Sequence, residues 1–317
     1  MPDIVVVGEA LIDMFAEPGA PLVDLPHFTP KLGGAPANVA AAVARLGGDV
    51  GLIAKVGADG FGKALRGHLK SIGVEVTHMS DAARPTMVAC VALPEPDRPE
   101  FVLFAGANAE LAPDDIDGTY LTSGRVMVFG SVTLGYRSRA AVLHAARLAR
   151  NAGCEVVFDV NLRPAIWPDL EEARAAILEA IALSSAVKLN EDEARFLFGD
   201  VAIEAAAGRM LSAGPDFCCI SRGAAGAYFA RPGDAAHIAG FRVDIVDTTG
   251  CGDAFLAGLA VGLAEASTRI AALGHDDLCD LITFANACGA FVATELGAMD
   301  APLTRHAAEA LMKGTSP

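Results

Sequence analysis

The sequence predicts an α/β fold in which a mostly parallel, doubly wound sheet carries helices on both faces. Short apolar runs typical of buried strands alternate with longer helical segments, and this alternation is typical of parallel sheets. Hydrophobic residues make up 53% of the 317 residues and aromatic residues only 6%. That mixture favours helices packed closely on a sheet over a β-sandwich.

The predicted elements follow in order from the N-terminus. The first strand, over Ile4–Val7, ends at Gly8, and a helix over Val39–Leu46 stops at Gly47. Further strands are predicted over Val50–Val56, Val126–Gly130, Val156–Val160, Ala186–Leu189, Phe217–Ser221, Tyr228–Ala230 and Ala236–Phe241. Further helices are predicted over Phe61–Ser71, Ser138–Asn151, Leu170–Leu183, Glu191–Phe198, Ile203–Ser212, Leu278–Glu295 and Thr304–Met312.

We expect one domain over residues 1–317 with a small β-sheet lid built from about 9–32 and 74–106. Four prolines within Glu9–Pro30 argue against a long helix there. Short β-prone pieces over Thr86–Leu93 and Phe101–Phe104 flank a turn cluster at Pro94–Pro99. Exposed sheet edges often pair between protomers, so we expect a homodimer through the lid.

Charge and cysteine usage narrow the class of protein. The formal net charge of −15 argues against nucleic acid or an anionic membrane as a partner, because such binders need a basic face. The seven cysteines show no CxxC spacing, which is typical of reduced thiols in a cytosolic protein. No uncharged run approaches the roughly 18–20 residues of a membrane span. We therefore expect a cytoplasmic protein.

The most informative stretch is Asp247–Phe255 (DTTGCGDAF), a glycine-rich turn that opens an apolar helix. The first turn of a helix has backbone N–H groups without partners, and the helix dipole adds partial positive charge there. Glycines at 250 and 252 let the backbone close on a phosphate. Asp253 would act as a base toward an attacking hydroxyl. Taken alone, Asp253 is explained as well by a helix N-terminal charge worth about 0.5–1 kcal/mol.

Two further patterns lie where a predicted strand gives way to a helix. Gly33-Gly34 followed by Asn38 forms one, and Asn190 followed by Glu193 forms the other. Each alone is explained by a turn or a capped helix. Ligands bind at the carboxyl ends of parallel strands, so the coincidence of these patterns with Asp253 favours a binding site.

Other nucleotide and metal motifs fail. Gly57–Ala64 nearly matches the P-loop, but Ala64 has no hydroxyl for magnesium, so we expect a plain strand-to-helix turn. Neither Gly8 nor Gly250-x-Gly252 completes a dinucleotide fingerprint, which disfavours a dehydrogenase. The seven histidines do not fall at metal-ligand spacing, which disfavours a zinc enzyme.

GGAPAN at Gly33–Asn38 and DTTGCGDAF at Asp247–Phe255 resemble the two signatures of the ribokinase-like, or PfkB, carbohydrate kinases. The resemblance extends from Gly8 to Pro302 and includes an NxxE between the two signatures. Within the family the sequence is most similar to bacterial fructokinases, through three stretches: GEALID at 8–13, DVNLRP at 159–164 and KLNEDE at 188–193.

The resemblance implies an ATP-dependent sugar kinase with Mg2+ and a role for each matching residue. Asp253 would be the base, the N–H groups of Gly250, Cys251 and Gly252 would stabilise the transferring phosphoryl group, and Arg163 would sit between sugar and γ-phosphate. The sugar-binding residues implied are Asp13, Gly33, Gly34, Asn38, Phe101 and Asn161. The nucleotide-binding residues implied are Lys188, Asn190, Glu193, Ser221, Gly223, Gly226 and Asn286, with Asn190 and Glu193 organising Mg2+ through water. Asp247 and the Thr249 carbonyl match a monovalent-cation site suited to K+.

The chain departs from the family pattern at the lid. Fructokinases often carry an Arg where Ala105 stands here, and Asp is common where Glu110 stands. The lid contact to the sugar is therefore altered. Fructose to fructose 6-phosphate is the leading reaction, with 2-keto-3-deoxygluconate kinase and riboside kinase as alternatives. A non-catalytic sugar or nucleotide sensor is the alternative of a different class, and Asp253 argues against it because a sensor needs no base.

Overall fold

The computed structural model describes residues 1–16, 22–24, 27–95 and 98–314, with the side chains of 93–101 left out. Within these residues nine strands form one large sheet, in the order β13-β12-β11-β10-β9-β8-β1-β4-β5. Its strands are β1 (Ile4–Val7), β4 (Val50–Gly57), β5 (Met79–Ala82), β8 (Val126–Gly130), β9 (Glu155–Asp159), β10 (Ala186–Asn190), β11 (Phe217–Ser221), β12 (Ala227–Arg231) and β13 (Asp234–Ile238). All neighbours from β11 to β5 pair parallel, and β12 and β13 extend the sheet antiparallel.

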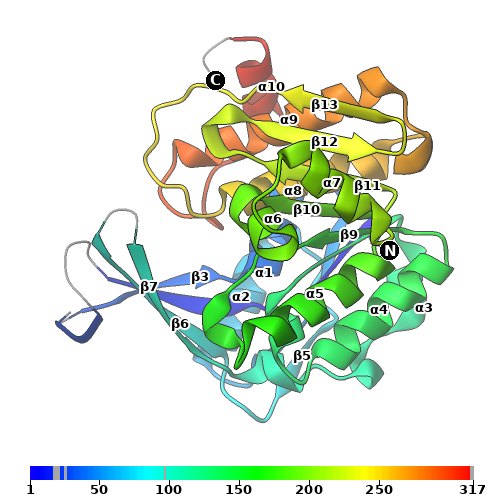
Figure 1. Cartoon of the computed structure of the whole chain (residues 1–317). Coiled ribbons are helices and arrows are strands. Elements are labelled where there is room, and N and C mark those ends of the chain that lie inside the picture. The colour runs from blue at the N-terminus through cyan, green and yellow to red at the C-terminus, as the bar shows by residue number, and fades with distance from the viewer. Residues whose placement is uncertain (17–21, 25–26, 96–97, 315–317) are drawn as a thin grey trace.

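Helices cover both faces of this sheet (Figure 1). One face carries α1 (Ala35–Arg45), α2 (Gly60–Ser71), α8 (Cys251–Glu265), α9 (His275–Ala293) and α10 (Arg305–Met312). The other carries α3 (Gly118–Ser123), α4 (Arg139–Asn151), α5 (Leu170–Leu183), α6 (Glu191–Phe198) and α7 (Ile203–Ser212). Among the helices of the described residues, none is long and apolar enough to span a membrane.

The first strand shows why the chain folds into a doubly covered sheet. Side chains of a strand alternate between its two faces. In β1, Ile4 and Val6 pack into the core on the α1 side, whereas Val5 and Val7 pack into the core on the α4 side. A run of four buried apolar residues therefore serves both cores, which is the pattern expected of a parallel strand covered by helices.

A second, four-stranded sheet projects from one side of the body (Figure 1). Its order is β3-β2-β6-β7, from β2 (Leu11–Phe15), β3 (Thr29–Gly33), β6 (Met87–Glu95) and β7 (Arg98–Phe104). Pro30 lies in β3 opposite Met14, and β3 is an edge strand, where proline costs no ladder hydrogen bond. This is why a proline-containing stretch still forms a strand.

Most predicted elements are confirmed, and several bounds agree fully. The strands Ile4–Val7, Val126–Gly130 and Phe217–Ser221 and the helices α5, α6 and α7 have the predicted limits. Part of the predicted lid segment 74–106 does not join the small sheet, because β5 pairs parallel with β4 and so belongs to the large sheet. The predicted strand Ala236–Phe241 begins earlier, at Asp234, and ends at Ile238, since Arg231–Asp234 forms the hairpin that starts it. Asp59 accepts a hydrogen bond from Gly62 N–H at 2.8 Å and caps α2, confirming a strand-to-helix turn there.

We expect Phe129→Ala to lower the free energy of unfolding by about 3–5 kcal/mol. Phe129 is 1% exposed in β8, and its ring centroid lies 4.7 Å from that of Phe158, so truncation leaves a cavity inside one core. Denaturant unfolding measures the change. Phe61→Ala is the matched control, because Phe61 is 38% exposed on α2. Equal losses in the two variants would contradict this account of the core.

Candidate active site

The carboxyl edge of the large sheet and the small sheet enclose a cavity of about 660 Å³. Residues of β2, β6 and β7, of the start of α1 and of the loop before α8 line it. The small sheet contributes an apolar wall of Leu11, Met87, Ala89, Val91 and Leu103. The predicted site residues that line the cavity are Asp13, Gly34, Asn38, Asn161, Arg163, Lys188, Asp247, Thr249, Gly250, Gly252 and Asp253.

The turn before α8 brings a helix N-terminus to this cavity. Gly250 caps the helix with φ 82°, and a Cβ on it would lie 2.3 Å from that of Ala298, so only glycine fits. Asp247 fixes the loop, because its two carboxylate oxygens accept hydrogen bonds from Thr249 N–H at 2.9 Å and Gly297 N–H at 3.0 Å. The Cys251 N–H group donates to the Thr248 carbonyl at 3.3 Å. The N–H groups of the first turn and the dipole of this 15-residue helix make its N-terminus attractive to a phosphate.

Asp253 lies in the first turn of α8 and is held by α1. The Nδ2 group of Asn38 donates a hydrogen bond to Asp253 Oδ2 at 2.8 Å, joining residues 215 positions apart. Burial raises the pKa of Asp253 to about 6, and the carboxylate of Asp159 adds to the rise. The Asn38 hydrogen bond and the charges of Lys188 and Arg163 oppose it. The result is a carboxyl group that is ionised at neutral pH yet basic enough to accept a proton.

Lys188 brings a positive charge to the same helix end. Its Nζ group lies 3.1 and 3.3 Å from the two carboxylate oxygens of Asp159, and both side chains are less than a tenth exposed. Although burial alone lowers the pKa of Lys188, the carboxylates of Asp159 and Glu193 raise it above its ordinary value. A Cβ on Gly252 would lie 3.0 Å from this Nζ, so the glycine lets the ammonium approach the helix backbone.

Glu9 and Asp13 bring two more carboxyl groups to the cavity wall. Burial raises the pKa of each to about 7, and the Asp253 charge adds to both rises. Arg163 opposes both, and its guanidinium donates to the Leu162 carbonyl at 3.2 Å. Asp13 lies over Gly33, where a Cβ would come within 2.0 Å of Asp13 Oδ2. Gly33 therefore leaves room for the Asp13 carboxyl group at the end of β3.

Asn190 and Glu193 form a capping box at the start of α6. Asn190 Oδ1 accepts from Glu193 N–H, and Glu193 Oε2 accepts from Asn190 N–H, both at 2.8 Å. Glu193 Oε1 also accepts from Leu162 N–H at 2.9 Å, so Glu193 ties α6 to the segment that carries Arg163. Burial and Asp159 raise the pKa of Glu193. Neither Asn190 nor Glu193 lines the cavity.

The remaining predicted nucleotide residues gather beyond the ends of β11 and β13. Ser221 Oγ donates to the Leu189 carbonyl at 3.3 Å, and Asn286 Nδ2 donates to the Ala239 carbonyl at 3.3 Å. Gly226 has φ 92°, and a Cβ there would meet the Ile238 carbonyl at 2.1 Å; Gly223 has φ 54°. None of these four lines the cavity. The side chain of Phe101 lies outside the described residues, and its backbone pairs with Val91.

Two residues of this site were missed as site residues by the sequence analysis. Glu9 and Asp159 occur in stretches that carry the family resemblance, but neither was assigned a role. The available signal is position: each stands at or just after the carboxyl end of a buried strand, β1 for Glu9 and β9 for Asp159. Both are almost fully buried acids, 2% and 3% exposed, which is uncommon without a partner or a function.

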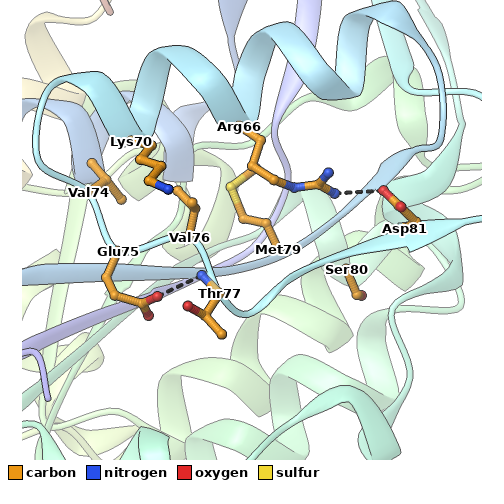
Figure 2. Close-up of a pocket in the computed structure, with 9 residues that line it drawn as sticks. All are labelled: Arg66, Lys70, Val74, Glu75, Val76, Thr77, Met79, Ser80 and Asp81. Atoms are coloured by element: carbon orange, nitrogen blue, oxygen red, sulfur yellow. Dashed lines mark hydrogen bonds and ion pairs between the residues drawn. The ribbon is translucent and has the colours of Figure 1, made fainter.

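A separate cavity of about 600 Å³ lies between α2 and β5 (Figure 2). Arg66 and Asp81 form an ion pair there at 2.7 Å, and Glu75 accepts from the Thr77 N–H at 2.7 Å. None of the predicted site residues lines it. Of these two cavities, only the first is therefore lined by predicted site residues.

Comparison with known proteins identifies the class of protein. A family model described as pfkB family carbohydrate kinase matches residues 1–305. A fructokinase of Klebsiella pneumoniae is 36% identical over 301 residues, which are 93% of this chain and 94% of the relative. A Vibrio cholerae O395 fructokinase, solved with fructose, ADP and calcium ion, superposes with a TM-score of 0.86 at 30% identity, covering 98% of both chains. Aminoimidazole riboside kinase from Salmonella enterica, solved with aminoimidazole riboside and an ATP analogue, superposes with a TM-score of 0.83 at 33% identity. The match covers 98% of this chain and 99% of that chain.

The chain belongs to the PfkB family of carbohydrate kinases. Its α/β sheet with a smaller separate sheet is the ribokinase-like fold of these relatives.

We expect Glu9→Gln to make the protein more stable than wild type at pH 8, by about 2–3 kcal/mol. The Glu9 pKa is raised from 4.5 to about 7 in the folded protein. The stability that the protonated Glu9 side chain contributes is therefore fully present below about pH 4.5. That contribution is lost as the pH rises through about 7. Gln stays uncharged and has nearly the same shape, so the difference should vanish near pH 4.

Denaturant unfolding at pH 4, 6 and 8 tests this prediction. Glu204→Gln is the control, since the Glu204 pKa is lowered and its loss should bring no gain at pH 8. A Glu9→Gln protein that is less stable than wild type at pH 8 would show that the ionised carboxylate is stabilised by its surroundings.

Proposed function

We propose that the protein is an ATP-dependent fructokinase that transfers the γ-phosphate of ATP to fructose and forms fructose 6-phosphate. The observation that carries the proposal is the Asn38–Asp253 contact at the N-terminus of α8. Asp253, with a pKa raised to about 6, lies in the first turn of α8, where backbone N–H groups suit a phosphate, and this supports its proposed role as a base. A sensor has no use for such a base, so a catalytic protein is favoured over a non-catalytic one.

Each step of phosphoryl transfer has a residue suited to it. Asp253 takes the proton of the attacking sugar hydroxyl as the new O–P bond forms, while the bond from the γ-phosphorus to the β,γ-bridging oxygen breaks and ADP leaves. The N–H groups of Gly250, Cys251 and Gly252 and the guanidinium of Arg163 stabilise the negative charge of the transferring group. Lys188, next to Gly252, adds a second cation at this end of the helix. Charge neutralisation and placement are the main requirements of this reaction.

The sugar is held between the two sheets. Asp13, Asn38 and Asn161 line the cavity and present hydrogen-bonding groups to it. Gly33 leaves room for the Asp13 carboxyl group, and Gly34 lets the backbone of Glu9 and Ala10 approach closely. Phe101 is proposed as a further sugar contact from the small sheet, which we regard as a lid over a single domain spanning 1–317.

The charge of the cavity favours a neutral sugar over a sugar acid. Asp159 and Lys188 neutralise each other at 3.1 Å. Arg163 acts on Glu9, Asp13 and Asp253 together, and Lys188 acts in addition on Asp253. A carboxylate substrate such as 2-keto-3-deoxygluconate would add a further negative charge to this group. Like charges brought together at an interface cost several kcal/mol, so fructose is the better match.

The remaining residues suit ATP and metal ions. With ATP bound, Mg2+ would neutralise the β- and γ-phosphates, and Asn190 and Glu193 would hold it through water. Water mediation fits the geometry, because both Glu193 oxygens already accept backbone N–H groups. Ser221, Gly223, Gly226 and Asn286 would line the nucleotide. The Asp247 carboxylate and the Thr249 carbonyl would hold K+, a cation that takes oxygen ligands.

We also propose a homodimer that forms through the small sheet. Val102 and Phe104 of β7, the edge strand, are 44% and 57% exposed, and apolar side chains on an exposed edge invite pairing. A cytoplasmic location agrees with the ATP requirement and with free cysteines.

Asp253→Asn should lower kcat by at least about 100-fold, because a general base contributes about 10²–10⁴. The amide keeps the shape and the Asn38 contact partner but cannot accept the proton. ADP release measures turnover, and calorimetry should show retained binding of ATP and fructose. Asp244→Asn, an exposed acid in the preceding loop, is the matched control and should keep wild-type kcat. Near-wild-type turnover by Asp253→Asn would refute the assignment.

A panel of acceptors tests the substrate. We expect fructose to give the highest kcat/KM, with 2-keto-3-deoxygluconate at least about 10-fold lower because of like-charge repulsion. ADP release with fructose, 2-keto-3-deoxygluconate and aminoimidazole riboside provides the comparison. A preference for the riboside would assign a riboside kinase, and the absence of turnover with every acceptor would favour a sensor.

A further inference from the structure

Cys279, His275 and Asp234 form a linked cluster away from the sugar cavity. His275 and Cys279 are four residues apart on α9, so their side chains share one face of the helix. The Cys279 Sγ atom lies 3.5 Å from His275 Nε2, and His275 Nδ1 lies 2.7 Å from Asp234 Oδ1. Asp234 begins β13, the edge strand beside this end of α9. The order thiol, imidazole, carboxylate is that of an activated nucleophile.

The hydrogen bonds fix which imidazole nitrogen can act as a base. Although burial alone raises the pKa of Asp234, hydrogen bonds from His275 and Arg231 hold it below its ordinary value. The ionised carboxylate is an acceptor only, so Nδ1 of a neutral His275 carries the proton and donates to it. Nε2 is then the acceptor that faces the thiol. Arg231, 2.8 Å from Asp234 Oδ2, holds the carboxylate in place.

The cluster compensates for a thiol that does not ionise readily by itself. Burial and the carboxylates of Asp276, Asp234 and Asp280 raise the pKa of Cys279. A base in contact with the thiol therefore matters, because the thiolate is the nucleophile. Cys279 is partly exposed, as are Cys90 and Cys251, whereas the other four cysteines are buried. In the part of the chain that the structure describes, no other cysteine is hydrogen-bonded to a histidine.

We propose that Cys279 is a modification site at which His275 and Asp234 activate the thiol toward small cationic disulfides. Cys279 Sγ attacks one sulfur of the disulfide, a new S–S bond forms and the original S–S bond breaks. The thiol proton passes to His275 Nε2 and then to the departing thiolate. The products are a mixed disulfide on Cys279 and one free thiol.

The surrounding charge selects the disulfide. Asp276 and Asp280 are exposed on either side of Cys279 in α9 and repel an anionic reagent. Arg231 is already paired with Asp234 and offers little compensation. A disulfide with ammonium groups is therefore attracted, and salt should weaken the attraction because the Debye length is about 8 Å at physiological ionic strength.

The experiment compares cystamine with oxidised glutathione on the full chain at pH 7. Site-resolved mass spectrometry follows adducts at Cys279 and at Cys90, which serves as the internal control. We expect cystamine to modify Cys279 at least about 10-fold faster than Cys90, within the range that a positioned base supplies. Cystamine should also outpace oxidised glutathione at Cys279, and this difference should shrink in high salt.

Two variants separate activation from simple exposure. His275→Gln and Asp234→Asn should each slow the Cys279 adduct while leaving the Cys90 rate unchanged. The rate of the Cys279 adduct should rise with pH, and in His275→Gln this rise should occur at a higher pH than in wild type. A purely structural role of His275 would not shift the pH profile. Kinase activity confirms that each variant is folded. The proposal is overturned if Cys279 reacts no faster than Cys90, or if the His275→Gln rate and pH profile match wild type.

Discussion

The hydrogen bond between Asn38 and Asp253 is the contact on which the site depends. It joins the first turns of α1 and α8, two helices that begin at glycines with positive φ, Gly34 at 101° and Gly250 at 82°. Both helix ends therefore face one cavity, and their N–H groups and dipoles add partial positive charge there. That charge helps to keep a largely buried carboxyl group ionised near neutral pH, which a base requires. The sheet and the helices around it hold these two ends together.

The buried acids Asp159 and Glu193 are explained by the same need to keep the Asp253 carboxylate ionised. Asp253 needs cations nearby, and Lys188 and Arg163 supply them, but an unpaired ammonium would itself be costly to bury. Asp159 pairs with Lys188, and Glu193 fixes the Leu162 backbone next to Arg163. A residue such as Glu193 thus has a structural role in the capping box and an indirect one at the site. Removing it would disturb both, which makes Asp253 the cleaner position for testing chemistry.

The sequence was sufficient for the main fold and for the residues with local signatures. Apolar runs and helix ends located β8, β11, α5, α6 and α7, because these elements are set by periodicity and capping. It was insufficient for the bounds of β2, β3 and β5, because these strands contain proline or charged residues and so lack a continuous apolar run. Glu9 and Asp159 were missed as site residues for a related reason. Their burial beside other charges depends on tertiary packing, and no spacing in the sequence encodes it.

The glycine pair at 33 and 34 also explains why the cavity lies between the two sheets. The chain leaves the small sheet at Gly33 and enters α1 after Gly34, directly beside the place where β1 continues into β2. A Cβ on Gly34 would lie 2.8 Å from the Glu9 carbonyl oxygen and 3.1 Å from Ala10 Cα. The two connections between the sheets, one at Glu9–Ala10 and one at Gly34, are therefore in backbone contact. Any side chain there would push the small sheet away from the large one and separate Asp13 from Asp253. The motif therefore sets the width of the cavity as well as contributing to its wall, and substitutions there should affect the fold and the substrate together.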